Sequence, residues 1–278
     1  QYKVQATVDS IIQQLLDVGA DRKTTLIGVG GGVITDITGY VAGVFMRGIK
    51  CGFVPTSILA MVDAAIGGKN GVDVGLYKNM VGLIRQPAFL LYDFSLLKTL
   101  PKEEWVNGFA EVIKHACIKD APMFKLLEEN KLSYFQKDFA ILAKLIQRNA
   151  LLKTKVVVDD EFESGERKLL NFGHTIGHAV ENLYKIPHGH AVSIGMGAAC
   201  KMSEVTTGFE DTERVVKVLK TYGLPPQFDF DREETFRILQ SDKKKDSAGI
   251  SYILLKKIGK AEIVSLPFEK IHELLNNL

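Results

Sequence analysis

Between residues 26 and 36 the sequence reads Leu26-Ile27-Gly28-Val29-Gly30-Gly31-Gly32-Val33-Ile34-Thr35-Asp36. An apolar run is followed by consecutive glycines and then by a helical pattern. Backbone without side chains can approach a pyrophosphate closely at the positive end of a helix. The turn at Gly30, Gly31 and Gly32 therefore predicts a nucleotide site. The alternative is a tight turn whose backbone needs positive φ values, which glycine also supplies.

The glycine turn departs from the ordinary dinucleotide fingerprint. Val33 stands where the pattern G-x-G-x-x-G has its third glycine. No acidic residue follows about twenty positions on to hold a ribose hydroxyl. The turn therefore predicts a nucleotide site, but one that does not bind its nucleotide through the common G-x-G-x-x-G motif.

The segments around this turn have the order of an α/β fold. A helical spacing of apolar residues precedes it, and a strand is expected at residues 25–29. A helix at residues 35–45 and a strand at residues 51–54 follow. Strand, helix and strand in this order predict a parallel sheet.

The next segments are expected to be a loop and a last strand. Residues 63–77 are rich in glycine, and Gly67-Gly68-Lys69-Asn70-Gly71 is too irregular for a helix and too polar for a central strand. We predict an ordered functional loop there and a strand at residues 89–93. The remaining chain is mainly helical in pattern, with a short strand pair near residues 252–255 and 261–264. We place a domain boundary near Leu97 and predict an α/β domain at residues 1–97 and a mainly helical domain at residues 98–278.

Composition limits the partners. The chain has 278 residues and a net charge of +2, which argues against a dedicated nucleic-acid or membrane surface. Its three cysteines are far apart, so a disulfide framework is not expected and a reducing cytoplasm fits best. No apolar stretch is long enough to span a membrane, and the first residues do not have the pattern of a signal peptide. The basic runs Lys243-Lys244-Lys245 and Lys256-Lys257 are read by default as solvated loops.

Four of the six histidines lie between residues 174 and 190. His174 and His178 are one helical turn apart, a spacing that allows both to bind one metal, but the glutamate of the metalloprotease pattern H-E-x-x-H is missing. A catalytic zinc commonly takes two histidines and a carboxylate. Glu111, which borders an apolar helical stripe, is the best candidate for the carboxylate. Spacing does not decide whether His178 or His188 is the second histidine.

Two alternatives need no metal. The histidines can be hydrogen-bonded helix caps, and Glu111 can pair with Lys114 or His115 on the next helical turn.

Several cations stand in unusual places. Lys153 continues the apolar face of a helix that follows Asp138, so it is expected to point inward. A lysine that snorkels to solvent is one explanation, and a partly desolvated cation for an anionic substrate is the other. Arg167, Lys69 and Lys78 raise the same question. Together these cations indicate a polyanionic ligand.

The motifs follow one another in a specific order along nearly the whole chain. They are Gly30-Gly31-Gly32-Val33-Ile34-Thr35-Asp36, Met46-Arg47-Gly48, Val54-Pro55-Thr56-Ser57, Val62-Asp63, Gly67-Gly68-Lys69, Lys78-Asn79-Met80, Ala110-Glu111-Val112-Ile113-Lys114, Lys153, Glu163, Gly165-Glu166-Arg167, Asn171-Phe172-Gly173-His174-Thr175-Ile176-Gly177-His178-Ala179, His188-Gly189 and Asp242-Lys243-Lys244. In order and spacing they closely resemble the 3-dehydroquinate synthases, the sugar phosphate cyclases of the shikimate pathway.

The resemblance implies an NAD-dependent metal enzyme, with an NAD-binding α/β domain at residues 1–97 and a mainly helical metal- and substrate-binding domain at residues 98–278. It makes Glu111, His174 and His188 the metal ligands and leaves His178 as an acid–base or phosphate-contacting residue. Two histidines and a carboxylate accept zinc, cobalt or iron, and we expect zinc or cobalt. The implied catalytic residues are His178, Lys114, Lys153, Asp63 and Glu163. The implied substrate-binding residues are Arg47, Lys69, Lys78, Asn79, Arg167, Asn171 and Lys244. The implied NAD-binding residues are Gly30, Gly31, Gly32, Asp36, Thr56, Ser57, Asp63, Lys69 and Lys78.

The implied reaction converts 3-deoxy-D-arabino-heptulosonate 7-phosphate into 3-dehydroquinate and phosphate, on the way to chorismate and the aromatic amino acids. Such an enzyme is a carbon–oxygen lyase that oxidises its substrate transiently with NAD. The resemblance also implies a cytoplasmic homodimer in which Arg47 reaches the neighbouring subunit's site. The rivals are cyclases of sedoheptulose 7-phosphate or glucose 6-phosphate, a polyol or alcohol dehydrogenase that releases NADH, and a nucleotide-sensing module without chemistry.

Two departures from the family are visible. The family's chain begins several dozen residues earlier with a segment that helps to bind the nucleotide, so this sequence is expected to be N-terminally incomplete. The family also has a glutamate after His188-Gly189, where this chain has His190. The hydrogen bonding around His188 is therefore open, and His190 is a possible competing ligand.

Overall fold

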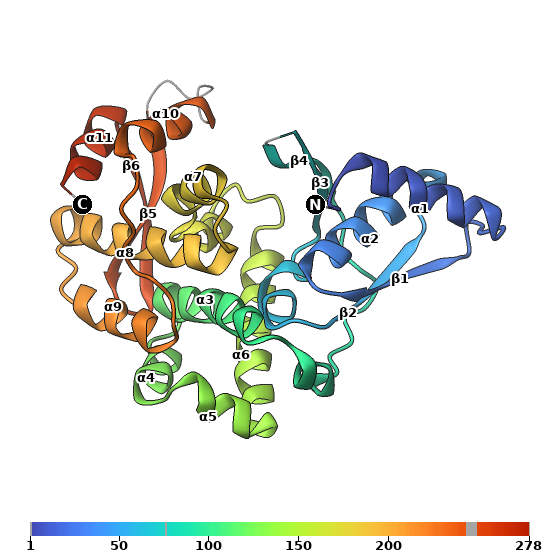
Figure 1. Ribbon diagram of the computed structural model, residues 1–278, viewed down its shortest axis with the longest axis horizontal. Helices are drawn as coiled ribbons and strands as arrows, with labels where there is room; N and C mark the ends of the chain where they lie inside the picture. The colour runs from blue at the N-terminus through green and yellow to red at the C-terminus, as the bar shows by residue number, and fades with distance from the viewer. Residues whose placement is uncertain (1, 76, 243–248, 278) are drawn as a thin grey trace. The chain divides into compact units, whose positions relative to one another are not determined.

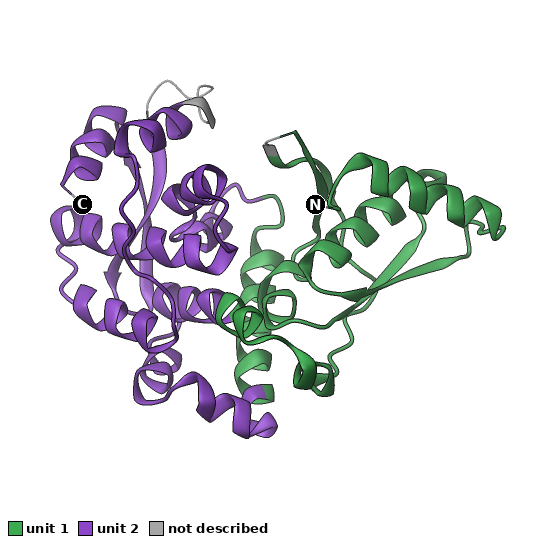
Figure 2. Ribbon diagram, viewed as in Figure 1, with its two compact units in different colours: residues 1–108, 143–162 green, residues 109–142, 163–278 purple. Residues whose placement is uncertain are grey.

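The computed structural model describes residues 2–75, 77–242 and 249–277 (Figure 1). The chain divides into two compact units (Figure 2). Unit 1 comprises residues 1–108 and 143–162, and unit 2 comprises residues 109–142 and 163–278. The division predicted between residues 97 and 98 stays a prediction.

Unit 1 contains strands, helices and short helical turns. Its elements are α1 (Gln5–Asp17), β1 (Thr25–Gly30), α2 (Gly32–Val44), η1 (Phe45–Arg47), β2 (Lys50–Pro55), the π-helical turn η2 (Ala60–Ala64), β3 (Lys69–Val74), β4 (Tyr77–Ile84), η3 (Phe94–Thr99), the start of α3 (Lys102–Lys119) and most of α6 (Phe139–Asp159). The predicted order of strand, helix and strand around the glycine turn is therefore confirmed.

The parallel sheet of unit 1 is smaller than predicted. β1 and β2 pair in parallel, from Thr25 opposite Lys50 to Gly30 opposite Pro55. The strand predicted at residues 89–93 is wrong among the described residues, because only Leu90 forms a bridge, with Phe53. This segment still runs along β2, since the backbone nitrogen of Phe53 donates to the Phe89 carbonyl oxygen at 3.1 Å. Its contacts are too few to extend the sheet by a full strand.

The predicted loop at residues 63–77 is also wrong at residues 69–74, which form strand β3. β3 and β4 form an antiparallel pair in which Gly71 lies opposite Gly82. Asn70 tolerates burial in a strand because its side-chain amide donates to the carbonyl oxygens of Gly68 and Arg85, at 2.7 and 2.9 Å. Val72 is fully buried in the cluster that joins α1 and α2. Hydrogen bonds distant in sequence thus make a strand of a segment that looks irregular locally.

Unit 2 is mainly helical, as predicted. Its elements are the rest of α3, α4 (Ala121–Glu129), α5 (Leu132–Lys137), η4 (Glu166–Asn171), α7 (His174–Tyr184), α8 (His188–Thr207), α9 (Thr212–Thr221), α10 (Arg232–Asp242), β5 (Ile250–Lys257), β6 (Lys260–Leu266) and α11 (Phe268–Asn276). The predicted strand pair is confirmed: β5 and β6 are antiparallel, from Ile250 opposite Leu266 to Lys257 opposite Lys260.

Helices α7 and α8 lie side by side in unit 2 (Figure 1). Small residues allow this close approach: a side chain at Gly177 would meet the Ala191 carbonyl oxygen at 2.9 Å. Gly173 precedes α7 with φ +77°, a value that favours glycine. Because α8 begins at His188, the contact brings the start of α8 close to the histidines of α7.

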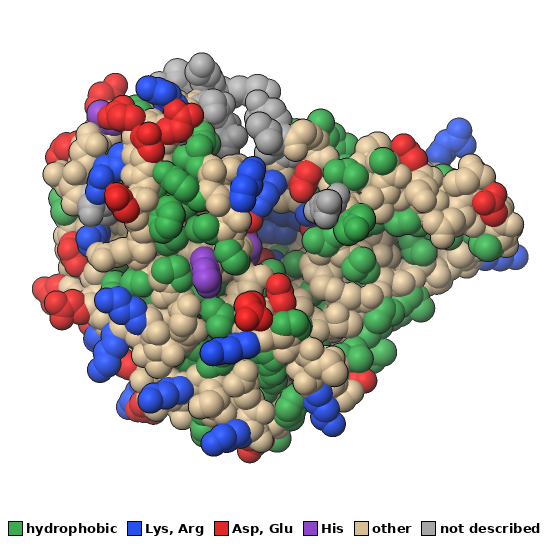
Figure 3. Space-filling model, in the orientation of Figure 1, with side chains coloured by type: hydrophobic (Ala, Val, Ile, Leu, Met, Phe, Trp, Pro, Cys, Tyr) green, Lys and Arg blue, Asp and Glu red, His purple; other side chains and the backbone are tan. Residues whose placement is uncertain are grey.

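No helix in the described parts of the chain is both long and apolar enough to cross a membrane. On the face drawn in Figure 3, acidic and basic side chains are interspersed. This mixture agrees with the small net charge.

Candidate active site

The glycine turn in unit 1 begins α2. Gly31 is the N-cap residue with φ −76°, and none of Gly30, Gly31 and Gly32 has a positive φ. The alternative of a turn that needs positive φ is therefore wrong. The glycines instead allow neighbouring segments to lie close to the turn, because a side chain at Gly32 would lie 2.9 Å from that of Ala64. At Gly31 an added Cβ would meet only Ser57, with the hydroxyl oxygen at 3.4 Å, so this residue presents bare backbone at a helix N-terminus.

Thr56 and Ser57 lie beside the glycine turn because β1 and β2 end together. The backbone nitrogen of Thr56 donates to the Gly30 carbonyl oxygen at 2.9 Å. The Ser57 hydroxyl accepts from the backbone nitrogen of Ala60 at 3.3 Å. The carboxyl ends of parallel strands are where open α/β sheets bind ligands.

Asp36 and Asn79, both predicted site residues, are joined by a lysine that the sequence did not single out. The Nζ atom of Lys3 lies 2.5 Å from Oδ2 of Asp36 and also donates to the side-chain oxygen of Asn79. Burial raises the pKa of Asp36 to about 6, although the charge of Lys3 acts in the opposite direction. Lys3 is 33 positions from Asp36, and no local pattern marks it.

Lys153 is buried, as its place on the apolar face of α6 predicted. Its Nζ atom donates to Oδ1 of Asp63 at 2.8 Å and to the backbone carbonyl oxygen of Asp63 at 2.6 Å. The cation therefore does not reach toward solvent, as a snorkelling lysine would. It fixes the π-helical turn η2, which Gly32 contacts.

The turn that carries Arg47 is strained and exposed. Met46 and Arg47 have φ values of 50° and 64°, which residues with side chains seldom adopt. Arg85 holds this turn, because its guanidinium donates to the carbonyl oxygens of Ala42 at 3.2 Å and Ile49 at 2.6 Å. The exposed cations Lys69 and Lys78 lie on β3 and β4.

In unit 2, helices α3, α7 and α8 bring three potential metal ligands together. Oε1 of Glu111 lies 3.1 Å from Nε2 of His188 and 3.5 Å from Nε2 of His174. One ligand atom from each residue lies within 4.8 Å of the others. Glu111 is fully buried, and the histidines are partly buried.

The other ring nitrogen of each histidine also has a partner. Nδ1 of His174 lies 3.1 Å from the Phe172 carbonyl oxygen, and Nδ1 of His188 lies 3.4 Å from Oε2 of Glu181. Oxygen acceptors at Nδ1 favour a proton there, which leaves Nε2 as the ligand atom. Both Nε2 atoms face Glu111.

The ionisable groups of this cluster shift one another's pKa values. Lys114 forms an ion pair with Glu111, so the pairing considered as an alternative to a metal is present together with the histidine contacts. Burial would raise the pKa of Glu111, but Lys114 and the two histidines outweigh it and hold this pKa well below its usual range. Burial lowers the pKa of His174. His188 also loses solvent, yet its bonds to Glu111 and Glu181 raise its pKa to about 9.

His178 is exposed, with its ring centroid 5.0 Å from that of His174 and 6.4 Å from that of His188. A second possible ligand set, made of His178, Glu181 and His188, therefore also exists. Among the described residues, His190 belongs to neither set. The set that contains Glu111 has the more completely buried carboxylate.

The segment before α7 places three further predicted site residues. Asn171 donates its side-chain amide to Glu163, which has a φ of 60°. Arg167 is only 2% exposed. Lys244 lies outside the described residues.

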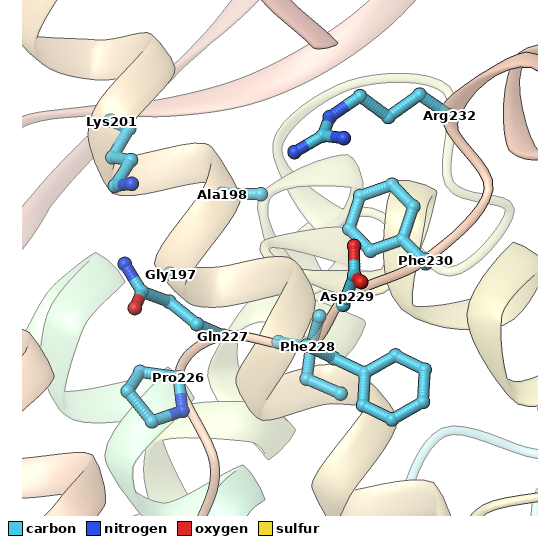
Figure 4. Close-up of a pocket in the computed structure, with 10 residues that line it drawn as sticks. Gly197, Ala198, Lys201, Pro226, Gln227, Phe228, Asp229, Phe230 and Arg232 are labelled. Carbon is cyan, nitrogen blue, oxygen red and sulfur yellow. The ribbon is translucent and has the colours of Figure 1, made fainter. Parts of the chain in front are cut away.

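A pocket of about 340 Å³ lies against the middle of α8, away from the helix start that holds His188 (Figure 4). Gly197 and Ala198 of the helix line it together with Lys201, Gln227 and Arg232. None of the predicted site residues lines this pocket.

The comparisons with known proteins cover both parts of the chain. The family profile described as 3-dehydroquinate synthase N-terminal matches residues 1–107, and the profile described as 3-dehydroquinate synthase C-terminal matches residues 108–245. The chain is 40% identical to the 3-dehydroquinate synthase of Pyrococcus abyssi over 280 aligned positions, which cover 100% of this chain and 82% of that protein.

Two solved structures are similar over 99% of the chain. One is a 2-epi-5-epi-valiolone synthase from Streptomyces hygroscopicus subsp. jinggangensis 5008 with NAD⁺ and Zn²⁺ bound, with a TM-score of 0.90 and 28% identity over 79% of its length. The other is a 2-deoxy-scyllo-inosose synthase in complex with carbaglucose-6-phosphate, NAD⁺ and Co²⁺, with a TM-score of 0.88 and 27% identity over 80% of its length.

Proposed function

The chain belongs to the 3-dehydroquinate synthase family, and from this premise we propose that it converts 3-deoxy-D-arabino-heptulosonate 7-phosphate into 3-dehydroquinate and phosphate. This is a carbon–oxygen lyase reaction of the shikimate pathway. The observation that carries the proposal is the convergence of Glu111, His174 and His188 in a chain that matches both parts of the family.

Glu111, His174 and His188 would hold a divalent metal. Two imidazole nitrogens and one carboxylate oxygen are a common ligand set of catalytic zinc, which keeps a further position for substrate. The buried Glu111 carboxylate and the Nε2 atoms that face it fit this set. Zinc or cobalt suits these donors. When bound, the metal lowers the pKa of a hydroxyl that it contacts.

NAD would bind at the glycine turn and supply reversible hydride transfer. The bare backbone of Gly31 at the start of α2 offers amide groups and room for a pyrophosphate. Thr56 and Ser57 lie next to it at the end of β2. We assign to the NAD site Gly30, Gly31, Gly32, Asp36, Thr56, Ser57, Asp63, Lys69 and Lys78.

Cations and amides would hold the anionic groups of the substrate. Arg167 presents a planar guanidinium whose donors match a carboxylate or phosphate. The bond between Asn171 and Glu163 fixes the segment around it. We assign to the substrate Arg47, Lys69, Lys78, Asn79, Arg167, Asn171 and Lys244. Orientation by such groups can supply several kcal/mol of the barrier reduction.

Proton transfer would use His178 and two lysine–carboxylate pairs, one in each unit. His178 is exposed beside His174, so it can exchange a proton with a substrate oxygen. Lys114 and Lys153 stay close to the carboxylates of Glu111 and Asp63. We assign catalytic roles to His178, Lys114, Lys153, Asp63 and Glu163.

The test supplies the purified chain with the keto acid phosphate, NAD⁺ and Zn²⁺ or Co²⁺. We expect inorganic phosphate to appear while absorbance at 340 nm stays flat, because the cofactor is regenerated in each cycle. Net NADH release would indicate a dehydrogenase. Turnover of sedoheptulose 7-phosphate or glucose 6-phosphate in place of the keto acid would assign the chain to another cyclase.

We also propose that the active form is a homodimer. The exposed and strained turn at Met46 and Arg47, held by Arg85, would present Arg47 to the neighbouring subunit. Positive φ at these two residues costs of order 1–3 kcal/mol each, and strain of this kind clusters at functional sites.

A further inference from the structure

His188 has a carboxylate at each ring nitrogen. Nε2 lies 3.1 Å from Oε1 of Glu111, and Nδ1 lies 3.4 Å from Oε2 of Glu181. An ionised carboxylate can only accept hydrogen bonds, so the proton of the second contact belongs to Nδ1. By the same argument Nε2 carries a proton toward Glu111 in the metal-free chain, and a metal bound at Nε2 would take the place of that proton while Nδ1 keeps its bond to Glu181.

We propose that Glu181 is a positioning residue of the metal centre, which fixes the orientation and the tautomer of His188. This inference rests on the metal site of the proposed function. Glu181 acts through the imidazole and is not itself a ligand.

The packing of α7 against α8 places Glu181 next to His188. Its side chain is only 10% exposed, and it lies on α7 two helical turns after His174, on the same face. The close contact of α7 and α8 at Gly177 brings Glu181 to the first residue of α8. A buried carboxylate needs a hydrogen-bonding partner, and the imidazole N–H supplies one.

The two histidine ligands differ in how they are held. Nδ1 of His174 is bound by a backbone oxygen, that of Phe172, which no side-chain substitution removes. The orientation of His188 depends on the side chain of Glu181. A substitution of Glu181 should therefore loosen one ligand and leave the other in place.

A competing role for Glu181 is that of a direct ligand. Its carboxylate, His178 and His188 also bring ligand atoms within 4.8 Å of one another. In that arrangement the loss of Glu181 or of His178 would abolish binding. In the proposed arrangement the loss of Glu181 weakens binding, and the loss of His178 leaves it intact.

The experiment measures the dissociation constants of Co²⁺ and Zn²⁺ by competition with a chelator in the purified chain and its variants. Loss of an outer partner of a ligating histidine typically weakens metal affinity about 10–100-fold, and we expect this for Glu181→Ala. Glu181→Gln keeps an oxygen acceptor and should lose less. Glu204→Gln, which removes an exposed charge from α8, is the matched control and should bind as the wild type does. His188→Ala should show no metal binding at metal concentrations that saturate the wild type.

Two further readouts separate positioning from a general loss of structure. The visible absorption of bound Co²⁺ should change in Glu181→Ala, because the ligand field follows the orientation of His188. The thermal midpoint of the metal-free chain should stay close to that of the wild type.

Three outcomes would overturn the inference. The first is wild-type affinity with a wild-type Co²⁺ spectrum in Glu181→Ala. The second is complete loss of binding in both Glu181 variants and in His178→Ala, which would make Glu181 a ligand. The third is a lower thermal midpoint with no change in affinity. If instead His188→Ala keeps wild-type affinity, the metal site of the proposed function fails, whatever the Glu181 variants do.

Discussion

Lys153 binds Asp63 twice in unit 1, through the carboxylate at 2.8 Å and through the backbone carbonyl at 2.6 Å. The lysine thereby ties helix α6 to the π-helical turn η2, whose last residue contacts Gly32 of the glycine turn. A single ion pair from the buried side of α6 thus connects this helix to the turn beside the proposed nucleotide site. The ammonium group is bound by these two oxygens and is buried.

Lys153→Met tests this arrangement, because methionine keeps most of the buried stem and removes the charge. We expect the KM for the keto acid phosphate to rise at least about tenfold, since one charge-assisted contact contributes roughly 1.5–3 kcal/mol. Asp63 is partly exposed, so its loss of a partner should lower the free energy of unfolding only modestly. Steady-state kinetics and thermal unfolding measure the two effects. Lys155→Met, an exposed change on the same helix, is the control, and unchanged KM and kcat in Lys153→Met would contradict a substrate role.

Gly31→Ala and Gly32→Ala separate cofactor binding from packing. A Cβ at Gly31 meets only Ser57, with its hydroxyl oxygen at 3.4 Å, and the residue has an ordinary φ, so the variant should fold with little change. The same methyl group would occupy space that the pyrophosphate needs, and we expect the dissociation constant for NAD to rise at least about tenfold. At Gly32 the methyl group would clash with Ala64 and lower the thermal midpoint. Calorimetric titration and thermal unfolding check both, and NAD binding equal to wild type in Gly31→Ala would speak against a pyrophosphate at this turn.

His174→Ala and His178→Ala test which histidines bind the metal. His174 faces the buried Glu111 carboxylate, whereas His178 is exposed. We expect His174→Ala to lose bound metal and His178→Ala to retain it while phosphate release slows by about 10²–10⁴-fold. Metal content by atomic absorption and single-turnover phosphate release are the measurements. His272→Ala on the exposed side of α11 is the control, and equal metal loss in both site variants would refute the ligand assignment.

Asp36 should make stability depend on pH. Burial raises its pKa from 3.8 to about 6, so between these values the folded chain keeps a proton that the unfolded chain has released. The free energy of unfolding therefore falls as pH rises through this window. The shift corresponds to at most about 3 kcal/mol. Asp36→Asn removes the effect.

We expect the stability of Asp36→Asn relative to the wild type to increase between about pH 4 and about pH 7, by up to about 3 kcal/mol. Chemical unfolding at both pH values measures this difference. Asp9→Asn, an exposed change on α1, should show no such trend. A difference between Asp36→Asn and the wild type that is the same at both pH values would exclude a raised pKa at Asp36.

Local sequence patterns predicted the elements that are formed by neighbouring residues. The apolar run, the glycines and the helical spacing predict β1 and α2 because each element is defined by neighbours in sequence. Glu181 was missed although a signal exists: it continues the face of His174 and His178 at helical spacing. That face could have been read as acidic support for a histidine.

Other features depend on contacts between distant residues. Asn70 is buried in a strand whose partner is β4, and one of its two side-chain hydrogen bonds goes to the carbonyl oxygen of Arg85, fifteen positions away. The bond from Lys3 to Asp36 spans 33 positions, and that from Lys153 to Asp63 spans 90. No window of the sequence contains both partners of such a bond, so spacing alone cannot predict it.

Arg47 gives the sharpest test of the proposed homodimer, because a residue that acts in the neighbouring site can be supplied by a different subunit. Arg47→Ala and His178→Ala should each be inactive alone. In a mixed dimer, the subunit with Arg47→Ala keeps its own His178 and receives Arg47 from its partner, so one of the two sites is complete. Random exchange makes half of the dimers mixed, and we expect about a quarter of the wild-type activity to return. Measured phosphate release after mixing the two variants, with each variant mixed with itself as the control, tests this. If Arg47 acts within its own subunit, no mixed dimer contains a complete site and activity stays absent, which would leave the strained turn at Arg47 without a role across the interface.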